Sequence, residues 1–228
     1  MSATDPKQPF PADHYWRRKF TASSNESQLG EPDNMSEFEY VMVLVSIVIA
    51  LAIAHLLTAV AEGIHRFRGN GEPIKLDAVF LLWVGFVLIW LVSFWWWEFK
   101  FQETAVEWSF GLYLFVISYA IVLFMLAEIL VPHRMRHVSD SYLHFVEGRK
   151  WFFGVLLLTQ AIDVVDTFLK GYEWGLRPEA LASYSVIFIV AIVGINSERR
   201  LIQTGAAVVA FASQVLYVTQ ELGVLGSW

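Results

Sequence analysis

The most informative absences from this sequence are cysteine and charge. Its 228 residues contain no Cys, which excludes disulfide bonds, thiolate nucleophiles, cysteine-ligated zinc and iron–sulfur clusters. Only 17% of the residues are charged, whereas soluble folds carry about 25%. Basic residues are outnumbered, with 16 Lys and Arg against 22 Asp and Glu. The resulting net charge of -6 gives no support to a nucleic-acid partner.

Hydrophobic residues make up 56% of the chain, and they gather in long runs. A helix needs about 20 mostly apolar residues to cross a bilayer. The runs predict six spans, at residues 40–61, 78–97, 108–131, 151–170, 180–197 and 201–220. The charged stripes of a soluble bundle and the polar–apolar alternation of a β-barrel are both missing from these runs. We therefore expect an all-α, polytopic membrane bundle over residues 38–222, with the lipid bilayer around it.

The first 37 residues have a different composition. They are rich in Pro, Ser, Asp, Asn and Gln and lack apolar periodicity, which predicts a disordered polar tail. The tail also lacks the apolar stretch of a cleavable signal peptide. Met35 stands just before the first span, so translation could start there, with the preceding residues as an upstream extension.

Lys and Arg in the short loops predict the orientation, because cytoplasmic loops are enriched in them. One side carries nine of them: Arg66, Arg68, Lys75, Arg134, Arg136, Arg149, Lys150, Arg199 and Arg200. The other carries three: Lys100, Lys170 and Arg177. This asymmetry places both termini outside. The outer loops are expected to be acidic, with residues such as Glu98, and to be edged by tryptophan.

Two short segments give the sequence a general resemblance to small bacterial inner-membrane proteins of unknown role. They are Glu-Phe-Glu-Tyr at 37–40 and Arg-Lys-Trp-Phe-Phe at 149–153, which leads into the fourth span. The resemblance implies a bacterial inner membrane as the location. It implies no activity.

Polar residues inside the fourth span are the main functional candidates, because ionisable groups at membrane depth are costly unless paired or hydrated. One helical face carries, at i, i+4, i+7 and i+11, the residues Thr159, Asp163, Asp166 and Lys170. Gln160 widens this stripe, and Gln214 of the sixth span is expected at the depth of Asp163. Two interpretations remain open. The stripe could line a hydrated proton or cation pathway, or Asp163 could be a structural residue hydrogen-bonded to Gln214.

A second candidate pair lies nearer the inner side. His55 of the first span and Glu128 of the third are expected to differ by roughly 6 Å in depth on the same side of the midplane, so they could pair. A proton relay from Asp163 through His55 to Glu128 would need waters or a hydroxyl such as Tyr119 in between. The simpler alternative is a neutral buried His bonded to a carbonyl or carboxylate.

Residues 132–149 predict a short amphipathic helix on the inner membrane surface. Its polar face carries His133, His137, Asp140 and His144, and its apolar face lies opposite. Two His at i, i+4 can share a metal, so His133 and His137 are weak metal ligand candidates. A polar wet face explains the same pattern without a metal.

No nucleotide-binding, metalloprotease or nucleophile-elbow motif occurs in the sequence, so we expect no enzyme activity and no cofactor. The favoured function is a small transporter or a proton or cation pathway through the fourth span. The alternative is a non-transporting membrane subunit or scaffold. Rows of small residues, Ala50-Ala54-Thr58 and Ala206-Ala210-Gln214, could pack helices within one chain or in a homo-oligomer.

Overall fold

The computed structural model describes residues 36–69, 74–102, 104, 106–132 and 138–221. The polar tail and the proposed start at Met35 therefore lie outside the described residues.

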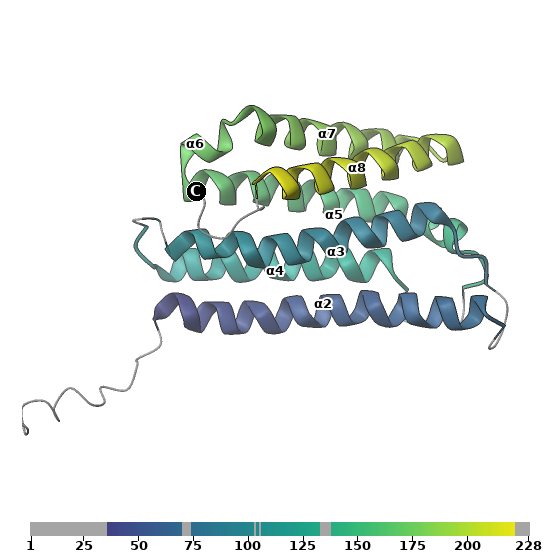
Figure 1. The fold of residues 1–228 in the computed structure, drawn as a ribbon, viewed down its shortest axis with the longest axis horizontal. Helices are drawn as coiled ribbons and strands as arrows, with labels where there is room; N and C mark the ends of the chain where they lie inside the picture. The colour runs from purple at the N-terminus through teal and green to yellow at the C-terminus, as the bar shows by residue number, and fades with distance from the viewer. Residues whose placement is uncertain (1–35, 70–73, 103, 105, 133–137, 222–228) are drawn as a thin grey trace, which may run out of the picture. The chain divides into compact units, whose positions relative to one another are not determined.

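The described chain is helical, with six helices long and apolar enough to cross a membrane (Figure 1). These are α2 Glu37–Phe67, α3 Ala78–Glu98, α4 Phe110–Leu130, α5 Ser141–Lys170, α7 Pro178–Asn196 and α8 Arg200–Glu221. Two short helical segments complete the order, η1 Phe99–Gln102 after α3 and α6 Tyr172–Gly175 after α5. The only bridge of β type within these residues joins Lys75 to Asp140. The predicted all-α membrane bundle is confirmed.

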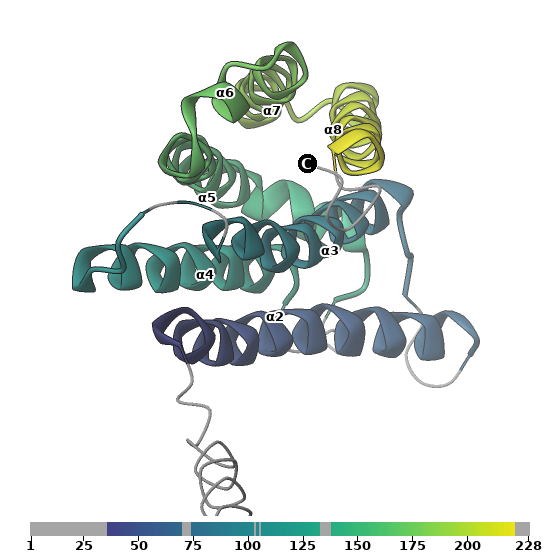
Figure 2. The ribbon, with the colours of Figure 1, turned by 60° about the vertical axis from the view of Figure 1, so that its left-hand side comes forward.

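The helices pack in an order that leaves four of them around a common centre. Figure 2 shows α3, α5, α7 and α8 surrounding one region, with α2 on the far side of α3 and α4. Neighbours in this arrangement pack directly, α3 against α8, α8 against α7 and α7 against α5. Helix α4 packs between α2 and α5. Any group on the inner face of α5 therefore faces three other helices.

Aromatic rings fill the core between α3 and α5. Trp83 is fully buried, and its ring centroid lies 5.0 Å from that of Phe152 and 5.3 Å from that of Phe153, both in edge-to-face geometry. Such pairs add about 0.5–1.5 kcal/mol beyond their buried area. Apolar side chains on the outer faces, such as Leu51 and Ile189, are exposed, as expected for contact with lipid.

The expected separate helix over residues 132–149 is corrected by the structure. Helix α5 begins at Ser141 and continues without a break to Lys170, so residues 141–149 form its first turns. Asp140 ends the preceding loop because its carboxylate accepts hydrogen bonds from the backbone N–H groups of Tyr142 and Leu143. Such a cap satisfies donors that the first helical turn leaves unpaired. His133 and His137 lie outside the described residues.

Polar contacts hold the loops together at the end of the bundle where α3, α5 and α8 begin. Asp77 caps α3 by accepting from the Val79 N–H at 2.9 Å, and it forms an ion pair with Arg200. The backbone N–H of Asp77 donates to the Ser141 hydroxyl at 2.8 Å. Arg66, at the end of α2, donates to the carbonyl of Val138 at 2.9 Å. These contacts fix the starts of three helices relative to one another.

Candidate functional site

Asp163 is the centre of a hydrogen-bonded group that joins three helices. The Tyr119 hydroxyl of α4 donates to Asp163 Oδ1 at 2.7 Å, and Gln160 Nε2 donates to Oδ2 at 3.3 Å. The Trp90 indole N–H of α3 donates to the Tyr119 oxygen at 3.3 Å. Tyr119 lies near the middle of α4, so Asp163 is near the centre of the span. Gln160 and Tyr119, both candidates from the sequence, are thus direct neighbours of Asp163.

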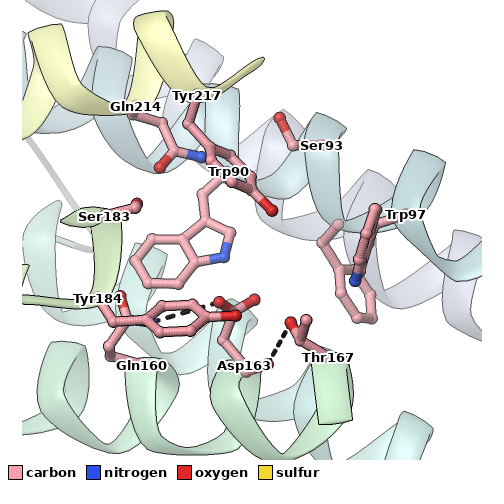
Figure 3. A pocket seen from close by; sticks show the side chains of 11 residues that line it. Trp90, Ser93, Trp97, Gln160, Asp163, Thr167, Ser183, Tyr184, Gln214 and Tyr217 are labelled. Atoms are coloured by element: carbon pink, nitrogen blue, oxygen red, sulfur yellow. Dashed lines mark hydrogen bonds between the residues drawn. The ribbon is translucent and has the colours of Figure 1, made fainter. Parts of the chain in front are cut away.

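Asp163 also lines a cavity of about 40 Å³ between α3, α5, α7 and α8 (Figure 3). The lining residues are Trp90, Ser93, Phe94, Trp97, Gln160, Asp163, Thr167, Ser183, Tyr184, Gln214 and Tyr217. One water needs about 10–15 Å³ of such space and several polar partners, so this cavity has room and partners for water. Gln214 shares the cavity with Asp163, as its expected depth predicted. The Asp163 carboxylate therefore borders a space large enough for water.

A buried ion-pair cluster lies one to two turns further along α5. Lys170 Nζ donates to Glu98 Oε1 at 2.9 Å and also contacts the Asp166 carboxylate. All three side chains are completely shielded from solvent. The sequence placed Asp166 and Lys170 on one face but assigned Glu98 to an outer loop, and that assignment is wrong. Helix α3 extends to Glu98, and the Lys170 ammonium provides the counter-charge that permits its burial.

Two further basic residues at this end of the bundle lie against tryptophan rings. Lys100 Nζ is 3.2 Å from the centroid of the Trp174 ring and 5.0 Å from that of Trp97. The Arg177 guanidinium carbon lies 3.8 Å from the Trp174 centroid on the same ring system. Lys100 is buried at 4% exposure, so the interpretation of this residue as an outer-loop charge is also wrong. Its sequence neighbours, a run of three Trp at 95–97, are the signal that could have indicated cation–π burial.

Three carboxylates lie near the cavity, and they differ in their partners. Asp163, Asp166 and Glu98 lie close together, and Lys170 forms ion pairs with two of them. Asp163 is held by neutral donors from Tyr119 and Gln160 instead. Asp163 therefore differs from Asp166 and Glu98, whose contacts include a charged partner.

His55 and Glu128 meet as expected from their depth. His55 Nε2 lies 3.2 Å from Glu128 Oε2 and 3.4 Å from the carbonyl oxygen of Val131. Both side chains are partly exposed, at 19% and 40%. Tyr119, which contacts Asp163, and Glu128 are nine residues apart on α4, about 13.5 Å along a helix. The His55–Glu128 pair is therefore well separated from Asp163. A proton relay between the two sites stays a prediction.

The remaining sequence candidates have different surroundings. Within the described residues, no group of three or more His, Asp or Glu side chains is placed to hold a metal ion. Ala206, Ala210 and Gln214 are buried inside the bundle on α8, so this small-residue row serves packing within the chain. The row Ala50, Ala54 and Thr58 lies on the exposed face of α2.

Comparison with protein families, with curated proteins and with solved structures finds no match for this chain.

Proposed function

We propose that this protein carries protons or small cations across a bacterial inner membrane, with both termini outside and with Asp163 as the binding group. The observation that supports this proposal is the position of a carboxylate, near the middle of the bundle, in the wall of a polar cavity. An ionisable group at this depth is costly, which favours a functional reason for its presence. The cavity gives it hydrated or ligand-filled space.

The surroundings of Asp163 allow it to gain and lose a positive partner. Tyr119 and Gln160 donate to its two oxygens and stabilise the negative form without a fixed counter-ion. Asp166, by contrast, has Lys170 as a permanent partner, so it is not available in the same way. Asp163 is therefore the better of the two candidates for reversible binding, and Asp166 serves as a structural neighbour.

Flux through proteoliposomes tests the proposal. We expect Asp163→Asn to reduce proton or cation flux at least about tenfold, because the neutral amide removes a charge-assisted contact of about 1.5–3 kcal/mol. Asp140→Asn is the matched control, since it makes the same chemical change on α5 at the helix start, where Asn also caps well. Flux that persists in Asp163→Asn, or flux that is absent from the wild type under every gradient, contradicts the proposal.

The second candidate is a non-transporting membrane subunit or scaffold. It is favoured by the fact that both Asp163 oxygens already have donors from the chain itself. In that case Asp163→Asn would lower the thermal stability in detergent, wild-type liposomes would show no flux, and affinity purification would recover a defined partner. These outcomes separate the two functions.

A further inference from the structure

A second, larger space adjoins the Asp163 cavity on the side of α7 and α8. It is an open groove of about 590 Å³. Its lining is mostly apolar in the interior and polar at one end: Pro178, Glu179, Ala182, Ser183, Val186, Val209, Ala212, Ser213, Leu216, Tyr217 and Gln220. Ser183 and Tyr217 line both the groove and the Asp163 cavity. The two spaces therefore meet at these side chains.

The walls of the Asp163 cavity are unusually aromatic for a polar site. Trp90, Phe94, Trp97, Tyr184 and Tyr217 contribute rings. Figure 3 shows the Tyr184 hydroxyl directed into the space beside Asp163 and Thr167. Tyr184 is 8% exposed, and within the described residues its buried hydroxyl makes no hydrogen bond of regular geometry, although the Thr167 hydroxyl lies within reach. A buried hydroxyl that is incompletely hydrogen-bonded is costly, so a guest that hydrogen-bonds to it would be stabilised.

Charge and ring chemistry indicate the sign of that guest. Aromatic faces attract cations, and attraction strengthens where water is excluded. The nearest carboxylate, Asp163, accepts from the neutral donors Tyr119 and Gln160, and the next two carboxylates pair with the Lys170 ammonium. An ammonium group could donate to Asp163 and to the Tyr184 hydroxyl together and would pair its charge with the carboxylate, whereas an anionic head group would be repelled and a neutral head group would lack the charge.

We propose that the Asp163 cavity binds the ammonium head of a single-chain amphiphilic amine whose alkyl chain lies in the groove between α7 and α8. The inference rests on the proposed role of Asp163 in binding a positive guest, and it adds a larger class of positive guest for the same site. The apolar interior of the groove, with Val186, Val209 and Leu216, fits an alkyl chain. The open groove gives a route from the bilayer, so the amine would enter sideways and not through an aqueous channel.

Binding of decylammonium to the full chain in zwitterionic lipid nanodiscs tests the inference. The probe should raise the temperature of unfolding of the wild type, because a ligand that binds only the folded state stabilises it. Decanol has the same chain without the charge, and methylammonium has the charge without the chain. Each should stabilise far less than decylammonium at the same concentration. Equal stabilisation by decanol would overturn the role of the cavity, and equal stabilisation by methylammonium would overturn the role of the groove.

Variants locate the site. Asp163→Asn should weaken decylammonium binding at least about tenfold, through loss of the charge-assisted contact. Ala212→Phe should weaken it as well, because the ring would occupy the groove. Ala161→Phe is the matched control, since Ala161 is an exposed alanine on α5 that lines neither space. Unchanged affinity in Ala212→Phe, or an equal loss in Ala161→Phe, contradicts the assignment of the groove.

The outcome is independent of the flux experiment. Flux that depends on Asp163 without any binding of decylammonium would overturn the amine and leave the cation pathway intact. Decylammonium binding that depends on Asp163 and Ala212, without flux, would support the binding site and contradict transport.

Discussion

At the scale of single residues, the buried carboxylates differ in whether they form an ion pair with a basic side chain. Glu98 and Asp166 share Lys170, and all three are sealed from solvent. A buried ion pair of this kind adds little net stability over apolar residues, but removal of one partner leaves an uncompensated charge. Lys170 is therefore the residue on which the burial of the two acids depends.

Replacement of Lys170 tests this dependence. Lys170→Met should lower the free energy of unfolding by about 3–5 kcal/mol, because two buried carboxylates lose their counter-ion. The combined variant Glu98→Gln, Asp166→Asn, Lys170→Met should recover part of that loss, since it removes the charges together. Denaturant unfolding in mild detergent measures both. A Lys170→Met protein as stable as the wild type would show that the cluster is not a coupled unit.

At the scale of helices, α5 and α7 pack directly against each other, and both contribute walls to the Asp163 cavity. Gly194 on α7 faces Phe153 on α5 so closely that an added Cβ would lie 2.2 Å from the ring. Only glycine permits this approach of the two helices. Ser183 and Tyr184, on the same helix as Gly194, line the cavity together with Asp163.

A pair of alanine substitutions tests the close approach. Gly194→Ala should destabilise the protein by about 1–3 kcal/mol, because the methyl group would force Phe153 or α7 to move. Gly154→Ala on α5, where an added Cβ meets nothing within 4 Å, should instead be neutral or stabilise by up to about 1 kcal/mol. Unfolding midpoints in detergent compare the two variants. Equal effects would mean that the contact does not restrict the helices.

At the scale of the whole molecule, exposed residues at the two ends of the bundle can report the orientation in the membrane. Glu173 lies exposed after α5, and Arg199 lies exposed before α8. These positions are better reporters than Lys100, which is buried. The chain has no Cys of its own, so each introduced Cys would be the only thiol.

Labelling of intact cells tests the predicted orientation. A membrane-impermeant thiol reagent should label Glu173→Cys and leave Arg199→Cys unlabelled until the membrane is opened, because Lys and Arg concentrate on the cytoplasmic side. Labelling of Arg199→Cys alone in intact cells would reverse the topology.

Local sequence was sufficient to predict what depends on one helix at a time. Helix α5 shows this, since the i, i+4 spacing of Asp166 and Lys170 brings them together in any regular helix. The pairing of His55 with Glu128 was anticipated from depth, because helices cross the bilayer at a fixed rise per residue, whereas the direct contact of Tyr119 with Asp163 was not. The start of α5 was misjudged because the amphipathic pattern continues across Asp140.

The long apolar runs were sufficient to specify a bundle of six helices able to cross a membrane, because a helix satisfies its backbone groups within itself in lipid. The packing between helices decided how the remaining polar groups meet. Glu98 and Lys170 are 72 residues apart, and the cavity takes its walls from four helices. In apolar helices the pattern of hydrophobicity does not say which face turns toward which neighbour, so side-chain packing decides the rotation of each helix.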